Sequence, residues 1–82
     1  MKITLIGDSV FDNAAYLAPG EPDTTGRLRE ALPGHECMLL ALDGSVTEGV
    51  IESQIPRVPR DTDALFVSTG GNDALAHADV LY

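Results

Sequence analysis

The chain alternates between short apolar runs and longer stretches in which apolar residues recur at helical spacing. Three apolar runs of four to six residues are each followed closely by glycine: Ile3–Ile6, Cys37–Leu42 and Ala64–Ser68. Continuous rather than alternating apolarity is typical of strands that are covered on both faces, as in a parallel sheet. We therefore predict three parallel strands.

Helices are predicted after the first and third of these runs. The first covers Thr24–Leu32, where Asp23 or Thr24 can cap the start and a Pro-Gly pair ends the helix. A helix after the third run is expected to begin at Asn72 or Asp73 and to continue through "ALAHADVL". Both helices follow a turn that contains proline or glycine, as helix boundaries commonly do.

Another helix is predicted between the second and third runs. It begins at "SVTE", where Ser45 and Glu48 have the spacing of a capping box, and it ends at Pro56. Its apolar stripe is expected to contain Val46, Val50, Ile51 and Ile55. Residues 11–22, "FDNAAYLAPGEP", predict a short helical turn followed by a loop.

This order of strands and helices predicts an α/β fold with right-handed crossovers. We expect a three-layer α/β/α, flavodoxin-like parallel sheet, represented by its first three strands in the order 2-1-3. The strand at 64–68 would then be an unpaired apolar edge, which invites association. We expect either a C-terminal half beyond residue 82 or a dimer partner to cover it.

Size and charge restrict the partners that the chain can have. Its 82 residues suffice for one small domain, and 44% of them are apolar. Thirteen acidic residues outnumber five basic ones, and no basic cluster is present, so a nucleic-acid partner is not expected. The longest apolar run, "MLLAL", is too short for a membrane helix. With no signal peptide expected, we predict a cytoplasmic protein that does not bind membranes.

Cys37 is the only cysteine, and its sequence surroundings predict a small buried thiol. It has no companions at metal-ligand spacing. We therefore expect no metal, and no organic cofactor is implied.

Polar residues follow each predicted strand at the point where the strand ends. "GDS" follows the first strand, "DGS" the second and "GGND" the third. Each motif taken singly is ordinary turn chemistry. Because parallel strands deliver their carboxyl ends to one edge of the sheet, the three motifs together predict a site at that edge.

The residue types at this edge suit acyl transfer, which needs a nucleophile and hydrogen-bond donors for the oxygen that becomes negative. Ser9 supplies a hydroxyl, Gly44 an unobstructed backbone N–H, and Asn72 a neutral amide donor. The structural alternatives are that Ser9 is only a turn residue and that Asn72 is only a helix N-cap.

The ordered motifs "GDSVFDN", "LDGSVT" and "GGNDAL" resemble the first three blocks of the GDSL/SGNH hydrolase family. The resemblance implies that residues 1–82 are the N-terminal portion of a single hydrolase domain. It also implies that Ser9 is the nucleophile and that the Ser9 N–H, the Gly44 N–H and the Asn72 side chain form an oxyanion hole. Asp8 would shape the turn. The G-x-S-x-G elbow of ordinary α/β-hydrolases is absent.

The family's Asp-x-x-His block, which supplies the general base, has no counterpart in this sequence. His35 is expected at the opposite edge of the sheet, and His77 lies nearer to Ser9 but off the family spacing. The roles of His77, Asp12 and Asn13 stay open. We expect the base beyond residue 82, and the 82-residue chain alone to be nearly inactive.

The sequence therefore predicts a serine ester or acyl hydrolase, of esterase or lipase type, that acts on a small acylated substrate. One alternative is a non-catalytic fragment or interaction module with the same fold. A flavodoxin-like nucleotide-binding module is disfavoured, because phosphate-loop motifs and basic residues are missing at the three strand ends.

Overall fold

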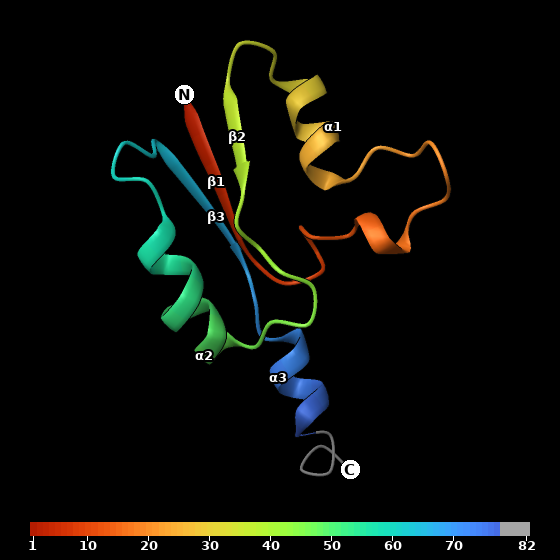
Figure 1. The fold of residues 1–82 in the computed structure, drawn as a ribbon, viewed down its shortest axis with the longest axis vertical. Helices are drawn as coiled ribbons and strands as arrows, with labels where there is room; N and C mark the ends of the chain where they lie inside the picture. The colour runs from red at the N-terminus through yellow and green to blue at the C-terminus, as the bar shows by residue number, and fades with distance from the viewer. Residues whose placement is uncertain (78–82) are drawn as a thin grey trace.

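The centre of the molecule is a three-stranded parallel sheet, seen in a computed structural model that describes residues 1–77 (Figure 1). The strands are β1 (Lys2–Gly7), β2 (Glu36–Leu39) and β3 (Ala64–Ser68), and their order is β2-β1-β3. Ile3 lies opposite Cys37 on one side and Ala64 on the other. The predicted α/β class and strand order are confirmed.

Helical segments cover the two faces of this sheet. The α1 helix (Thr24–Ala31) lies on one face. On the other face, the short α2 helix (Thr47–Gly49) continues into a π turn, η2 (Val50–Gln54), and a 3₁₀ turn, η3 (Ile55–Arg57). A 3₁₀ turn, η1 (Ala14–Tyr16), confirms the predicted helical turn. The α3 helix (Gly71–Ala76) projects beyond the carboxyl ends of the strands (Figure 1).

Alternate residues of β1 supply the two halves of the core. Ile3 and Leu5 pack with Cys37, Leu28 and Leu32 on the face covered by α1. Cys37 is buried and unpaired, as predicted. Ile6 points to the opposite face, since strand side chains alternate. It packs there in a second cluster with Leu40, Val50 and Val58.

The predicted apolar stripe between the second and third strands is only partly correct. Val50 is buried, but Ile51 and Ile55 are 57% and 48% exposed. The chain forms a π turn here, which has more residues per turn than an α-helix and so changes which side chains face the sheet. The inward positions are Val50 and Gln54.

Two predicted helix starts are wrong and one is confirmed. Asp23 caps α1 by accepting a 2.7 Å hydrogen bond from the Gly26 N–H. The capping box at Ser45 does not form, because α2 begins at Thr47 and makes no side-chain cap of its own. The α3 helix begins at Gly71 after a left-handed Gly70, so Asn72 is not its N-cap. The predicted continuation of this helix through 78–82 lies outside the described residues.

β2 is shorter than predicted, because its backbone leaves the ladder after Leu39. The N–H groups of Leu40 and Ala41 both donate to the Leu5 carbonyl, at 2.9 and 3.0 Å. β3 is an edge strand within the described residues, and its apolar side chains are only half covered. Leu65, Phe66 and Val67 are each more than 40% exposed.

Candidate active site at the carboxyl edge of the sheet

The loop after β1 is a tight turn that presents Ser9. Gly7 has a φ of +133°, which favours glycine. The carbonyl of the buried Asp8 accepts hydrogen bonds from the Phe11 and Asp12 N–H groups, and its carboxylate accepts one from the Val10 N–H. Asp8 therefore shapes the turn, as predicted. Ser9 is half-buried and lies just after the turn begins.

The loop after β2 presents Gly44. The Ser45 N–H donates to the Leu42 carbonyl at 3.1 Å, which closes a four-residue turn. Gly44 is the third residue of this turn and has a φ of +86°, whereas Asp43 has a negative φ. These signs are those of a type II turn, which favours glycine at this position. Among residues 1–77, no atom outside Gly44 and its two chain neighbours lies within 4 Å of where a β-carbon on Gly44 would be, so the backbone is unobstructed by them on that side.

The loop after β3 presents Asn72 from the first turn of α3. The Asn72 Nδ2 donates a 2.8 Å hydrogen bond to the Ser45 carbonyl. Ser45 directly follows Gly44, so the Asn72 amide lies next to the Gly44 turn. A carboxamide nitrogen carries two hydrogens, and this bond uses one of them.

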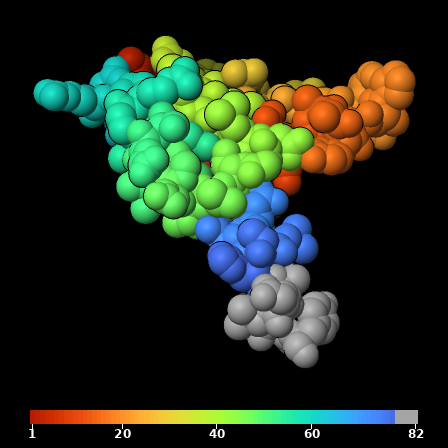
Figure 2. Space-filling model, turned by 60° about the horizontal axis from the view of Figure 1, so that its bottom comes forward, coloured from red at the N-terminus to blue at the C-terminus, as the bar shows by residue number. Residues whose placement is uncertain are grey.

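Side-chain hydrogen bonds join the loop after β1 to the loop after β2. The Asp12 carboxylate accepts a 2.7 Å bond from the Asp43 N–H. The Gln54 side chain bonds both backbone groups of Gly7 and also the Ser45 hydroxyl. Seen from the carboxyl edge, the yellow-green segment around residues 40–50 adjoins the blue α3 helix (Figure 2).

Asp73 joins α3 to the start of α2. Its carboxylate accepts hydrogen bonds from the Thr47 backbone N–H at 2.9 Å and from the Thr47 hydroxyl at 2.8 Å. The backbone bond is the larger reason that the pKa of Asp73 lies below its usual value, and the hydroxyl bond adds to it. Asp73 is therefore ionised at neutral pH and supplies the cap that α2 lacks.

The structure thus brings the three predicted motifs to one edge of the sheet. Asn72 and the Gly44 turn are joined directly, and the loop that carries Ser9 is joined to them through Asp12 and Gln54. That Ser9, Gly44 and Asn72 meet at a single carbonyl oxygen stays a prediction.

Neither histidine forms a hydrogen bond to Ser9 within residues 1–77. The His35 Nδ1 lies 2.9 Å from the N-terminal amine of Met1, at the amino edge of the sheet, where it was predicted. His77 follows the last turn of α3 and is exposed.

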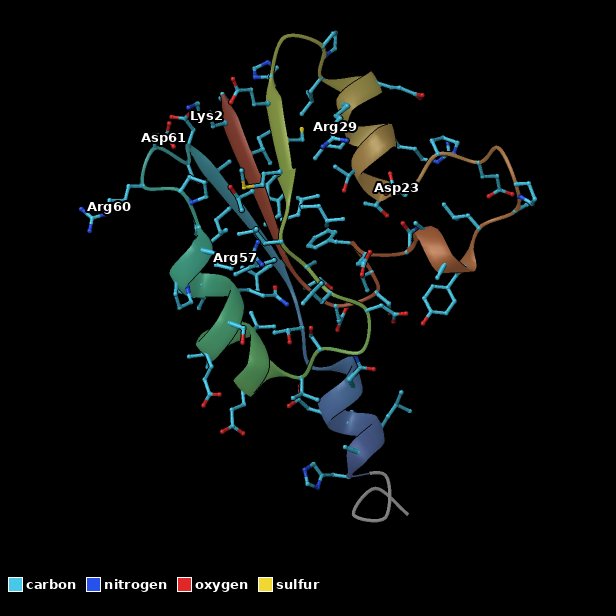
Figure 3. The ribbon with its side chains drawn as sticks, viewed as in Figure 1. Lys2, Asp23, Arg29, Arg57, Arg60 and Asp61 are labelled. Carbon is cyan, nitrogen blue, oxygen red and sulfur yellow. The ribbon has the colours of Figure 1, made fainter. Side chains whose placement is uncertain are left out.

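Charge is distributed unevenly between the two edges. Lys2 pairs with Asp61 at the amino edge, opposite α3 (Figure 3). Segments 8–23, 40–49 and 68–77, which contain the carboxyl-edge loops, have no lysine or arginine. They hold seven acidic residues: Asp8, Asp12, Glu21, Asp23, Asp43, Glu48 and Asp73. An anionic ligand would therefore be repelled at this edge.

A pocket of about 230 Å³ lies elsewhere, at the amino half of the sheet. Its lining includes Lys2, Thr4, Met38 and Thr62, and none of the three predicted site residues. Among residues 1–77, no three His, Cys, Asp or Glu side chains are grouped so that they could hold a metal ion. No helix in the same range has the length and apolarity needed to cross a membrane.

The sequence analysis missed Gln54, although a signal was present. Gln54 follows Val50 by four residues and therefore occupies the same side of the helical segment as a predicted core residue. A polar residue at such a position is buried only if it is hydrogen-bonded.

Comparisons of the chain with protein-family models, with curated proteins and with solved structures find no match.

Proposed function

We propose that this chain carries the nucleophile and the oxyanion hole of a serine ester hydrolase of the GDSL/SGNH type. The Ser9 oxygen attacks the acyl carbonyl, its proton passes to a general base, and the carbonyl oxygen becomes negative. The N–H groups of Ser9, Gly44 and Asn72 stabilise that oxygen. The alcohol leaves with the proton from the base, and water then hydrolyses the acyl-serine by the same steps.

The contact between Asn72 and Ser45 is the observation that carries this proposal. A neutral amide donor from the third motif lies 2.8 Å from the turn that presents the Gly44 N–H in the second motif. The Gly44 turn itself is open on the side where a substituent would be. Two neutral donors beside an unobstructed backbone are what an oxyanion hole needs.

The proposal includes a general base that lies outside the described residues. A serine hydroxyl at its ordinary pKa is a poor nucleophile, and an imidazole oriented by a carboxylate normally takes its proton. In the GDSL/SGNH family an Asp-x-x-His segment has this role. We therefore propose that such a segment completes the site in the full-length protein.

The charge at this edge narrows the proposed substrate class. The carboxyl-edge segments carry seven acidic residues and no basic ones. We propose a small uncharged or cationic acylated substrate, because phosphate or carboxylate groups would be repelled.

An activity-based serine probe tests this function. A fluorophosphonate added to the full-length protein should modify Ser9, located by peptide mapping, and leave the exposed Ser53 unmodified as an internal control. Ser9→Ala should abolish both labelling and p-nitrophenyl acetate turnover. Labelling of Ser53 at an equal rate, or full activity in Ser9→Ala, would refute the proposal.

A second variant tests the oxyanion hole. Asn72→Ala should lower kcat by about 10²–10³-fold with little change in KM, as loss of one such donor does. A rise in KM at unchanged kcat would mean that Asn72 only binds substrate.

A further inference from the structure

The Gln54 side chain is a buried carboxamide directly beneath the candidate site. Gln54 is only 1% exposed. Its Oε1 accepts a 2.7 Å hydrogen bond from the Gly7 N–H, and its Nε2 donates to the Gly7 carbonyl at 2.9 Å and to the Ser45 hydroxyl at 3.1 Å. The side chain therefore uses its acceptor and its donor group together, in a place that water does not reach.

The Gln54 carboxamide forms hydrogen bonds to Gly7 of the kind that a longer β2 strand would form. β2 ends at Leu39, opposite Leu5, so Gly7 has no β2 residue beside it. A neighbouring parallel strand would offer one C=O and one N–H to Gly7 from two successive peptide groups, and the single Gln54 amide offers the same two groups. The Gly7 carbonyl also accepts from the Leu42 N–H at 3.2 Å, whereas the Gly7 N–H donates to Gln54.

The same side chain joins the first motif to the second, and Asn72 of the third motif bonds the same Ser45 residue. Gly7 lies two residues before Ser9, and Ser45 lies one residue after Gly44. The carbonyl of Ser45 accepts the bond from Asn72. The strand end before Ser9 is therefore connected to Asn72 through Gln54 and through Ser45, whose hydroxyl bonds Gln54 and whose carbonyl bonds Asn72.

We propose that Gln54 is a positioning residue that fixes the oxyanion donors relative to the nucleophile. It touches no reacting atom and acts through Gly7 and Ser45. This inference rests on the proposed function of the site. Displacing a reacting group by about 1 Å can cost about 10²-fold in rate, so a link of this kind affects catalysis more than substrate binding.

The principal test compares Gln54→Met with Glu52→Gln in the full-length protein. Methionine has a similar length and apolar bulk but cannot form the three hydrogen bonds. Glu52 is an exposed residue of the same turn and serves as the matched control. Gln54→Met should lower kcat by about 10–10²-fold at nearly unchanged KM, and Glu52→Gln should behave as wild type. A folded Gln54→Met protein with wild-type kcat would overturn the inference.

Ser45→Ala keeps the test decisive if Gln54→Met does not fold. This variant removes only the hydroxyl end of the link and leaves both Gly7 bonds to Gln54 in place. It should retain the fold and lower kcat in the same direction, by a smaller factor. Wild-type kcat in Ser45→Ala would contradict a link through this hydroxyl.

Nuclear magnetic resonance separates this inference from the proposed function. In Gln54→Met, the Gly44 backbone amide and the Asn72 side-chain amide should shift and exchange faster with solvent, whether or not the protein is active. If the wild-type protein shows no serine labelling, the proposed function fails while these shifts still support the link. Unchanged Gly44 and Asn72 resonances would overturn the link even in an active enzyme.

Discussion

Gly7→Ala should destabilise the protein severely, because two separate costs meet at this residue. Gly7 has a φ of +133°, a conformation that residues with a side chain rarely adopt. A β-carbon there would overlap the carbonyl oxygen of Ser68 and lie 2.6 Å from its carbonyl carbon. Both atoms belong to the β3 backbone, which cannot move without disturbing its pairing with β1.

The magnitude follows from these two costs. A residue held in a sparsely populated backbone region costs about 1–3 kcal/mol. Forcing extra atoms into a packed region costs a further 1–3 kcal/mol, typically. A total of about 2–6 kcal/mol is a large part of the stability of a domain of this length, which at roughly 0.05–0.15 kcal/mol per residue is on the order of 4–12 kcal/mol.

Urea denaturation followed by circular dichroism measures the effect, with Gly34→Ala as the matched control. Gly34 also has a positive φ, +87°, but no atom lies within 4 Å of its missing β-carbon. Its replacement should cost only the backbone contribution, about 1–3 kcal/mol. Equal free energies of unfolding for the two variants would refute the predicted clash with Ser68.

Asp73→Asn should remove the charge-assisted hydrogen bonds to Thr47 and lower the free energy of unfolding at neutral pH. Because the pKa of Asp73 is lowered in the folded state, this loss of stability should be complete above the pKa of the unfolded chain and should vanish as the pH falls through the folded pKa. Thermal melts of both proteins across this pH range measure it. A pH-independent difference would contradict this assignment. Asp23→Ala should lower the free energy of unfolding by about 0.5–2 kcal/mol, measured by urea denaturation, because it removes the cap on the Gly26 N–H of α1. An unchanged free energy of unfolding would contradict this role of Asp23. Val67 is 55% exposed on β3, which has no second neighbouring strand within residues 1–77, so Val67→Lys should reduce any self-association seen by light scattering, with little change in stability. Undiminished association would argue that this edge is not the contact.

The strands and their order could be predicted because the signals are local. Each strand is a continuous apolar run with glycine nearby, and alternation with helices leaves few possible topologies. Ala64–Ser68 was predicted with its observed bounds, and β2 was predicted too long, since Leu40 and Ala41 are buried but have left the ladder. Apolar residues in the sequence predict which positions are buried, but burial does not distinguish a strand from the bend that follows it.

The start of α2 and the links within the site could not be predicted from local sequence, whereas the Asp23 cap of α1 could. The cap of α2 comes from Asp73, which is 26 residues from Thr47 along the chain, whereas the local sequence pattern pointed to Ser45. Gln54 was missed because the predicted stripe included only apolar side chains, although Gln54 follows the buried Val50 by four residues. The positions of the three motifs followed from parallel topology, whereas the bonds between them depend on tertiary contacts.

The attachment of α3 has a consequence for the durability of the site. None of its described residues is buried, so polar bonds from Asn72 and Asp73, rather than packing, hold this helix against the loops. Water and urea compete for such bonds more readily than for an apolar core. The Asn72 amide should therefore separate from the Ser45 carbonyl at denaturant concentrations that leave the sheet intact, and the proposed hydrolase activity would be lost well before global unfolding.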